Sequence, residues 1–252
     1  MNSIALRGRY QGLLQIVNFN GRMYAAALAA CAVLCAALPF LGSAERAALA
    51  FGLAPAVFWM ASSLAVSHYV YDRSPLYELD WLARGLARPV GSWINIHSGW
   101  DESSERLKVI FPQAAGQVID LFDPRIMTES SIRRARRINR SGPSDCARYD
   151  ALPFGDSSFD TAFAIFAAHE LRRHDQRAIL FREIARVLSA NGELVVVEHL
   201  RDWRNFLAFG PGFLHFFSPA DWHRAALEAG LIVRTEFSFT PFVRVFIFER
   251  KP

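Results

Sequence analysis

Cysteine is scarce in this chain, with three in 252 residues. Cys31 and Cys35 lie four residues apart within an apolar stretch, as small packing residues of a helix do, and Cys146 is isolated. This pattern argues against a disulfide framework, an oxidising compartment and a cysteine metal site. The net charge is only +4, and no RNA-binding or helix-turn-helix signature accompanies it, so we expect no nucleic-acid partner.

Formal charge is missing from two long stretches near the N-terminus. Residues 23–44 hold no charged side chain, and after Glu45 and Arg46 the stretch 47–71 again holds none. A helix needs about 20 apolar residues to cross a bilayer, so both stretches predict transmembrane helices, and their short link makes them an antiparallel hairpin. The alternative is a buried hairpin in a soluble protein.

Positive charge flanks this hairpin on the side of its two ends. The link holds only Arg46, whereas the flanks hold Arg7, Arg9, Arg22, Arg73, Arg84 and Arg88. The positive-inside rule therefore favours both ends, and the domain that follows, on the cytoplasmic side of a bacterial inner membrane. We expect residues 1–90 to anchor the chain, with an amphipathic helix over 74–90 that lies on the membrane or packs on the domain.

A second basic run lies in the middle of the chain, formed by Arg133, Arg134, Arg136, Arg137 and Arg140. Its plain interpretation is a solvated helix face. The alternative is a patch that meets anionic lipid headgroups, so membrane lipid is an expected partner.

The pattern changes from Ser92 onward, where short apolar runs alternate with helical stretches. This alternation is typical of a parallel sheet covered by helices. We predict strands at 93–97, 117–122, 160–166, 193–198, 232–239 and 242–249. We predict helices at 102–111, 128–138, 173–188 and 219–229. The last two strands are expected to form an antiparallel hairpin, and residues 91–252 to form one α/β domain.

The second half of this domain carries a specific order of motifs. Residues 150–160 read DALPFGDSSFD, and His169, IARVL at 184–188, NGELVVVE at 191–198 and FSPADW at 217–222 follow. This series resembles class I S-adenosylmethionine-dependent methyltransferases, and within them the group of ubiquinone and menaquinone C-methyltransferases. The resemblance implies a doubly wound, mostly parallel, seven-stranded Rossmann-like sheet, with the cofactor S-adenosylmethionine across the carboxyl ends of the strands.

The resemblance also implies which residues bind the cofactor. Asp123 matches the acid that accepts the ribose hydroxyls, with Asp120 as a poorer candidate. Asp150 and the backbone of Ala151 match the place where the adenine amine is read. The plain alternative for both aspartates is a role in forming turns.

The glycine loop after the first strand departs from the family pattern. In INIHSGWD (94–101) only Gly99 is kept, His97 and Asp101 stand at the places of the outer glycines, and Asn95 replaces an acid. The resemblance places Asn95, His97 and Gly99 in the cofactor site, where added side chains narrow the space. Asp101 is also suited to cap the helix that follows.

Histidines and carboxylates gather at the predicted strand ends. His169-Glu170 and Glu198-His199 follow two strands that we expect to be neighbours, and His97 ends a third. We select His169, Glu198 and His199 as catalytic residues for general acid–base chemistry. Two alternatives stay open: a divalent metal site formed by His97, His169, Glu170, Glu198 and His199, and hydrogen-bonded loop structure without chemistry.

An aromatic segment follows, with Phe206, Phe209, Phe213, His215, Phe216 and Phe217. Beside a membrane anchor, this segment suits a hydrophobic small-molecule acceptor, such as a quinone, an aromatic polyketide, a polyene or a lipid. The sequence therefore predicts a membrane-anchored S-adenosylmethionine-dependent methyltransferase. The alternatives are a non-catalytic binding or scaffold protein that keeps the fold, and a metal-dependent enzyme on the remodelled site.

Overall fold

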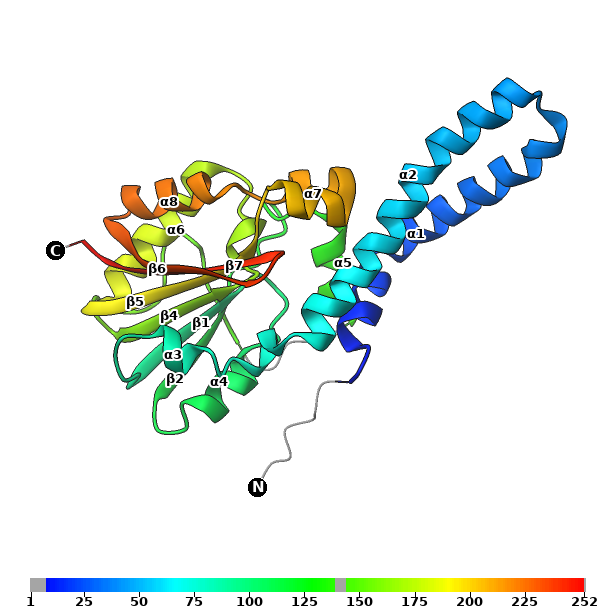
Figure 1. Cartoon of the computed structure of the whole chain (residues 1–252). Helices are drawn as coiled ribbons and strands as arrows, with labels where there is room; N and C mark the ends of the chain where they lie inside the picture. Colours follow the sequence, from blue (N-terminus) through cyan, green and yellow to red (C-terminus); the bar gives the residue numbers. More distant parts are fainter. Residues whose placement is uncertain (1–7, 139–143, 252) are drawn as a thin grey trace.

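The computed structural model describes residues 8–138 and 144–251, so Arg7 and Arg140 lie outside the described residues. A helical hairpin projects from an α/β domain, as Figure 1 shows. Its arms are α1 (Gln11–Ala37), continued by a 3-10 turn (η1, Leu38–Phe40), and α2 (Ser43–His68), continued by a π-helical turn (η2, Tyr69–Arg73). The Glu45 carboxylate accepts a hydrogen bond from the Gly42 amide at 2.8 Å, which caps the start of α2.

The base of the hairpin is held by one buried carboxylate. Asp72 on η2 accepts hydrogen bonds from the backbone N–H groups of Gly12 (2.6 Å) and Leu13 (3.0 Å), in the first turn of α1. His68 lies 2.9 Å from the same carboxylate. Because a helix begins with unpaired N–H groups, Asp72 acts as a cap supplied by the other arm.

The hairpin also rests on the domain. Trp59 of α2 packs edge-on against Phe206 of α7 (Trp203–Phe209), and Ser62 donates to the Leu207 carbonyl at 3.3 Å. Arg134 of α5 (Ser130–Ile138) donates to the Phe19 carbonyl of α1. Both arms therefore contact the domain near one end of the sheet.

The prediction of one amphipathic helix over residues 74–90 is wrong. The segment forms a 3-10 turn (η3, Pro75–Glu78) and one α-helical turn (α3, Leu82–Gly85), separated by Leu79 in the left-handed region at φ 56°. Leu76, Leu79 and Leu82 are fully buried against one face of the sheet. The leucine spacing correctly indicated an apolar face, but Leu79 in the left-handed region interrupts the helix.

The seven-stranded sheet has the order β3-β2-β1-β4-β5-β7-β6. The strands are β1 (Ser92–His97), β2 (Ala115–Asp120), β3 (Asp145–Cys146), β4 (Phe159–Ile165), β5 (Leu188–His199), β6 (Leu231–Thr240) and β7 (Val243–Arg250). Strands β1 to β5 are parallel, and β7 pairs antiparallel with both β5 and β6. This confirms the predicted mostly parallel, seven-stranded Rossmann-like fold.

Helices cover both faces of the sheet. On one side lie α6 (His174–Val187) and α8 (Pro219–Glu228), whose apolar residues join a core with β1, β4 and β5. On the other side α4 (Ser104–Ile110) and the 74–90 segment cover a second core that includes Trp93 and Phe163. Figure 1 shows these layers, with the hairpin base near the carboxyl ends of the parallel strands.

Two features of the domain differ from the sequence-based prediction. The second strand was expected to end at Phe122 but ends at Asp120, because residues 121–127 turn away from the sheet. The two-residue β3 and the seven-residue α7 were not predicted, since both are too short to show a hydrophobic period.

Candidate active site

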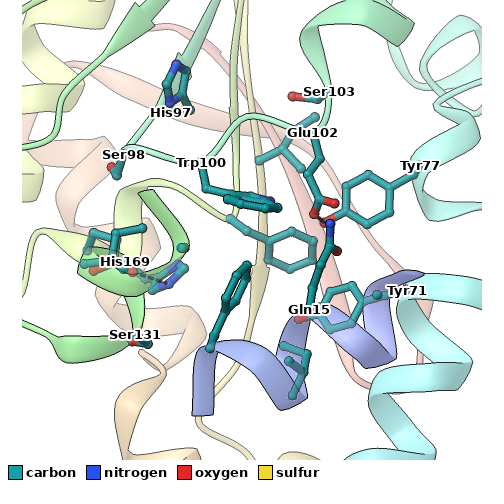
Figure 2. Close-up of a pocket in the computed structure, with 18 residues that line it drawn as sticks. Gln15, Tyr71, Tyr77, His97, Ser98, Trp100, Glu102, Ser103, Ser131 and His169 are labelled. Carbon is teal, nitrogen blue, oxygen red and sulfur yellow. Dashed lines mark hydrogen bonds and ion pairs between the residues drawn. The ribbon is translucent and has the colours of Figure 1, made fainter. Parts of the chain in front are cut away.

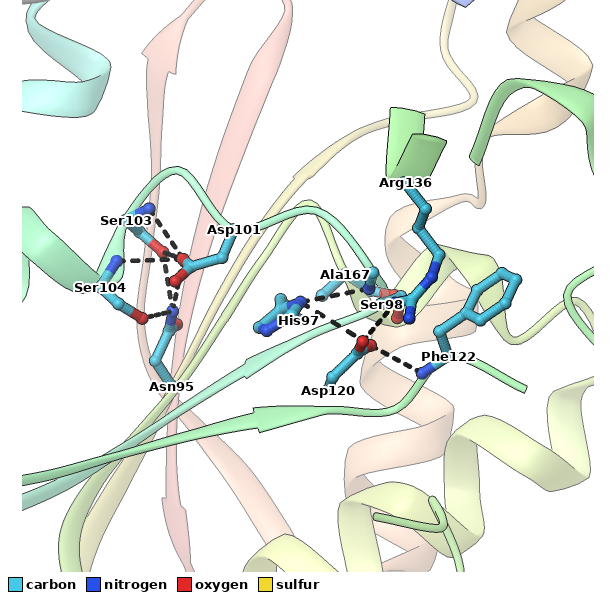
Figure 3. Close-up of polar contacts among 11 residues, drawn as sticks. Asn95, His97, Ser98, Asp101, Ser103, Ser104, Asp120, Phe122, Arg136 and Ala167 are labelled. Carbon is cyan, nitrogen blue, oxygen red and sulfur yellow. Dashed lines mark hydrogen bonds and ion pairs between the residues drawn. The ribbon is translucent and has the colours of Figure 1, made fainter. Parts of the chain in front are cut away.

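The loop after β1 is a closed turn built on polar side chains. The Asn95 amide donates to the Asp101 carboxylate (3.2 Å) and to the hydroxyls of Ser103 (2.9 Å) and Ser104 (2.7 Å), as Figure 3 shows. Asp101 also accepts from the backbone N–H groups of Ser103 and Ser104, each at 3.0 Å, so it caps the start of α4. Asn95, a predicted cofactor residue, is therefore buried and committed to holding this loop.

Gly99 is the point where this loop needs glycine. Its φ of +92° is unfavourable for side-chain-bearing residues. Its N–H donates to Nδ1 of His97 at 3.1 Å, so the single N–H hydrogen of the neutral imidazole lies on Nε2. Among the described residues, that buried Nε2 atom has no hydrogen-bond partner.

His97 ends β1 directly beside the acid that ends β2. His97 and Asp120 are paired in the sheet register, and His97 Nδ1 lies 3.8 Å from the Asp120 carboxylate. Burial lowers the pKa of His97, more than the nearby carboxylates raise it, so the imidazole is neutral at pH 7. The carboxylate at the strand end is thus Asp120, which the sequence ranked below Asp123.

The side chain of Arg136 covers this corner. Its guanidinium hydrogen-bonds to the Asp120 carboxylate and lies over the Phe122 ring at 4.4 Å, while its stem fills the space where a Gly99 side chain would stand. Figure 3 shows Arg136 reaching down from α5 onto Asp120. One arginine of the predicted basic run is therefore part of the candidate site.

The other predicted cofactor residues lie farther out. Asp123 forms a bidentate ion pair with Arg125, whose hydrogen bonds hold the pKa of Asp123 at about 2. Asp150 pairs in the same way with Arg148, and Ala151 bridges to Arg148 through the backbone. Both aspartates thus stabilise short turns, as the turn-forming alternative describes.

A cavity of about 180 Å³ opens beside the loop, as Figure 2 shows. His97, Trp100 and Glu170 line it, together with residues of α1 and the turn at Tyr71 and Tyr77. Trp100 packs edge-on against Phe19 of α1, with ring centroids 4.8 Å apart. We call this space the loop cavity.

A second and larger cavity of about 920 Å³ lies between the hairpin and the domain. Its apolar walls come from α1 and α2, and its polar end holds Glu129, His169, Glu170, Glu198 and His215. It shares with the loop cavity the lining residues Ile16, Phe19, Tyr71, Ser131, Phe166, His169 and Glu170. We call this space the hairpin cavity, and it meets the loop cavity at His169.

His169 and Glu198 meet as the neighbouring strands predict. His169 follows β4 on a 3-10 turn (η4, Ala168–Glu170), and its Nδ1 donates to the Glu198 carboxylate at 2.8 Å. Burial alone would lower the pKa of His169, but Glu198 and Glu170 outweigh it and raise the pKa to about 10. The imidazole is therefore a cation at neutral pH, held between two carboxylates.

His215 and Glu129 complete the polar end. The sequence placed His215 only within the aromatic segment expected to contact the acceptor, and it indicated no role for Glu129. His215 ends the 3-10 segment η5 (Gly210–His215), and its Nδ1 lies 3.0 Å from Glu129. Arg172 donates to the carbonyls of both His169 (3.1 Å) and His215 (2.7 Å), which fixes the two histidine-bearing segments to each other. No local sequence signal joins positions 129, 169 and 215, because only the fold brings them together.

His199, the third predicted catalytic residue, has partners on both nitrogens. Its Nδ1 donates to the Phe242 carbonyl at 2.8 Å, and its Nε2 accepts from the Tyr71 hydroxyl at 2.7 Å. It stacks between Phe166 and Phe216, and burial lowers its pKa to about 4. His199 is therefore a neutral, fully engaged side chain of the cavity wall.

The predicted metal set is also rearranged. Among the described residues, the group with metal-binding geometry is His169, Glu170 and His215, whose ligand atoms lie within 4.8 Å of one another. His97, Glu198 and His199 lie outside this group. Glu198 and His199 already use their polar atoms on His169 and Tyr71, and the Gly99 N–H holds His97 at the loop after β1.

Comparison with known proteins gives one family and a common fold. Residues 125–196, less than a third of the chain, match the family model described as a methyltransferase domain. None of the curated proteins matches the chain. A SAM-dependent methyltransferase from Aquifex aeolicus is 16% identical, with a TM-score of 0.52 over 69% of this chain and 92% of that one. Human N-acetylserotonin methyltransferase in complex with SAM is 12% identical, with a TM-score of 0.53 over 94% and 70%.

The residues at the ends of β1 and β2 fit an adenosyl ligand in part. The Asp120 carboxylate offers acceptors for a ribose diol, the Phe122 ring offers an aromatic face, and Gly99 leaves space that a Cβ would fill. Arg136 occupies that space, and the loop cavity of about 180 Å³ is smaller than usual ligand pockets. The Arg136 side chain is 34% exposed, and its rotation into solvent would open this space for the cofactor. The chain thus has the fold of S-adenosylmethionine-dependent methyltransferases, and its residues 125–196, which include strands β3 and β4, match a methyltransferase domain.

Proposed function

We propose that this protein is a membrane-anchored S-adenosylmethionine-dependent methyltransferase whose acceptor is a hydrophobic molecule with one polar end. The observation that carries the proposal is the junction of the two cavities at His169. The loop cavity lies at the loop after β1, beside the Asp120 and Gly99 corner that fits an adenosyl ligand in part, and the hairpin cavity offers an apolar space next to it. S-adenosylmethionine supplies an electrophilic methyl group on a sulfonium centre.

The shape of the hairpin cavity supports an acceptor with a long apolar part. Its lining extends along α2 from Ala48 to Ser67, which is about 29 Å at 1.5 Å per residue. Small residues on the facing arms, such as Ala27, Ala30 and Gly52, leave the space open. A chain-like group would lie between the helices, with its reactive head at the domain. Quinones, polyenes and lipids share this shape, and the resemblance to quinone C-methyltransferases favours the first.

The outer surface of the hairpin supports insertion into a bilayer. Both helices are long and apolar enough to cross a membrane, with mean hydropathy of 2.0 and 1.8 in their most apolar windows, and neither window is buried. Phe40 and Phe51, near the tip, are 88% and 85% exposed. Such exposed apolar area is costly in water and favourable in lipid. With both ends inside, the domain lies on the cytoplasmic face.

At the polar end, the protein's own residues prepare the acceptor. Glu170 has one carboxylate oxygen without a hydrogen-bond partner among the described residues and is positioned to take a proton from an acceptor hydroxyl or enol. The cationic His169, oriented by Glu198, stabilises the oxyanion that results. The apolar walls exclude water, and methyl transfer then depends mostly on alignment of the acceptor with the sulfonium.

The test uses the full-length protein in liposomes with tritium-labelled S-adenosylmethionine and a total membrane-lipid extract. We expect label to enter the organic phase with the wild-type protein and not with Asp120→Ala. Gly52 lines the hairpin cavity, and a Cβ added there meets no described atom within 4 Å, so Gly52→Leu should fill part of the cavity and lower the labelled yield at least about fivefold. Gly21→Leu, an equally unhindered helix glycine outside the cavity lining, is the matched control.

The position of Arg136 favours a second candidate, a cofactor-free binding protein that keeps the fold. Calorimetry with S-adenosylmethionine separates the two. Failure to bind at millimolar cofactor, in both wild type and Arg136→Ala, would reject the methyltransferase and leave the binding protein.

A further inference from the structure

The polar end of the hairpin cavity holds more negative than positive charge. Glu129, Glu170 and Glu198 contribute three carboxylates, and Arg172 contributes one guanidinium near Glu129 at 4.0 Å. With the imidazolium of His169 counted, the group carries a net charge of −1. Glu170 and Glu198 in this group are buried, and buried carboxylates need a nearby counter-charge.

The two histidines are oriented as metal ligands are in proteins. Each uses Nδ1 on a carboxylate, His169 on Glu198 (2.8 Å) and His215 on Glu129 (3.0 Å). This leaves Nε2 of each ring for another partner. In His169 that atom lies 3.5 Å from the Glu170 carboxylate, and a metal ion would replace the proton of the imidazolium there. A carboxylate behind the far nitrogen is the usual outer partner of a metal-binding histidine.

Glu170 is the third candidate ligand, and its buried carboxylate is independent evidence for a bound cation. Its side chain is 91% buried, and its Oε2 atom has no hydrogen-bond partner among the described residues. The ligand atoms of His169, Glu170 and His215 lie within 4.8 Å of one another. A shift of about 1 Å would bring all three to the metal–ligand distance of about 2 Å.

We propose that His169, Glu170 and His215 bind one divalent transition-metal ion, with Zn²⁺ as the best match to two imidazoles and one carboxylate. Three protein ligands leave a fourth position open, as in catalytic zinc sites, and here it faces the hairpin cavity. Arg172, which bonds to the backbone of both histidines, keeps the two segments at the required separation.

The open position defines the head of the acceptor. A hydroxyl or enol oxygen bound there loses its proton more readily, and that proton passes to the Glu170 oxygen that does not bind the metal, or to solvent. With the ion bound, the metal replaces the imidazolium of His169 as the group that stabilises the oxyanion. This role rests on the proposed function, whereas the metal site itself does not. The acceptor class it selects is an oxygen-bearing ring or enol with an apolar tail.

The test uses full-length protein in detergent, stripped with a chelator and titrated with Co²⁺ as a spectroscopic substitute for Zn²⁺. We expect one ion per chain, visible d–d absorption of a four-coordinate site, and displacement by Zn²⁺. His215→Ala should weaken binding more than about 100-fold, and Glu129→Gln about 10-fold or more. His174→Ala, a surface histidine paired with Glu228, should change affinity less than about twofold.

Two further measurements separate direct metal ligation by His215 from a structural effect of its substitution, and failure of the metal site from failure of the proposed function. His215→Cys should retain the ion and add a sulfur-to-cobalt charge-transfer band, which direct ligation alone produces. Absence of stoichiometric Co²⁺ and Zn²⁺ binding in folded wild-type protein, or binding unchanged in His215→Ala, would overturn the metal site. S-adenosylmethionine calorimetry on Glu170→Gln is independent of the metal: if it binds cofactor while wild type binds no metal, only the metal proposal fails.

Discussion

The guanidinium of Arg136 rests on the Asp120 carboxylate in the corner where an adenosyl ligand would place its ribose. Arg136→Ala removes the guanidinium that competes with the cofactor for this place, and it leaves the buried Asp120 carboxylate without its ion-pair partner. Because the arginine is a third exposed, its contact contributes about 1 kcal/mol, so S-adenosylmethionine affinity should rise about fivefold. Calorimetry measures this, with the exposed Arg137→Ala as control. Weaker binding in Arg136→Ala would show that the arginine helps to hold the cofactor.

Asp120 and Asp123 make a matched pair for locating the ribose site. Asp120→Ala should weaken S-adenosylmethionine binding about 30-fold, because two charge-assisted hydrogen bonds to the ribose would be lost. Asp123→Ala should change binding less than about twofold, since its carboxylate is taken by Arg125 on the surface. The reverse ranking in calorimetry would return the role to Asp123, as the sequence first suggested.

The order of these two aspartates illustrates what the sequence could and could not predict. The alternation of apolar runs and helices predicted the sheet and its flanking helices, because burial on both faces leaves a clear pattern. The end of a strand leaves no such pattern, so β2 was extended by two residues and Asp123 was preferred to Asp120. The meeting of His169 with Glu198 was predicted from strand adjacency, whereas His215 and Glu129 come from loops whose path depends on the whole fold.

In the hairpin, too, some features could be predicted from the sequence and others could not. Its two helices were evident from missing charge, but the contact that joins their ends, Asp72 to the amides of Gly12 and Leu13, was not. Residues 74–90 were predicted as one helix because leucine spacing indicates a buried face without indicating the backbone that presents it. Tertiary packing on the sheet decided that backbone.

Asp72→Ala should loosen the base of the hairpin. It removes the acceptor for two N–H groups at the start of α1, and loss of such a cap costs about 1 to 2 kcal/mol. Thermal unfolding in detergent should show a lower midpoint, and amide hydrogen exchange should speed up in the first turn of α1. Asp80→Ala, a largely exposed aspartate, is the control. Unchanged exchange at Gly12 and Leu13 would contradict the capping role.

The stability of the domain should depend on pH through His199. Its pKa is about 4 in the folded protein and 6.5 as the ordinary value, so between these pH values the unfolded chain binds a proton that the folded chain does not. The stabilisation is complete above pH 6.5 and is lost as pH falls toward 4, by up to about 3 kcal/mol. Chemical unfolding between pH 7 and 4 measures the slope.

Two variants identify His199 as the source of that slope. His199→Gln keeps a side chain that hydrogen-bonds but does not titrate, so its unfolding free energy should fall less over the same pH range. His223→Gln, on the exposed pair with Glu236, should keep the wild-type slope. Equal slopes in wild type and His199→Gln would mean that other groups cause the acid sensitivity.

One wall of the hairpin cavity comes from the helical hairpin and the other from the sheet domain. The residues that react with the acceptor and the residues that select its size therefore lie far apart in the sequence. The glutamate and histidine side chains belong to the sheet domain, while the small residues that set how long a guest fits belong to α1 and α2. Exchange of residues 8–73 between two such proteins would therefore transplant preference for tail length without altering the reacting groups. Conversely, a fragment reduced to the sheet domain would retain those groups in a site open to solvent. Such a fragment would distinguish poorly between acceptors of different tail length.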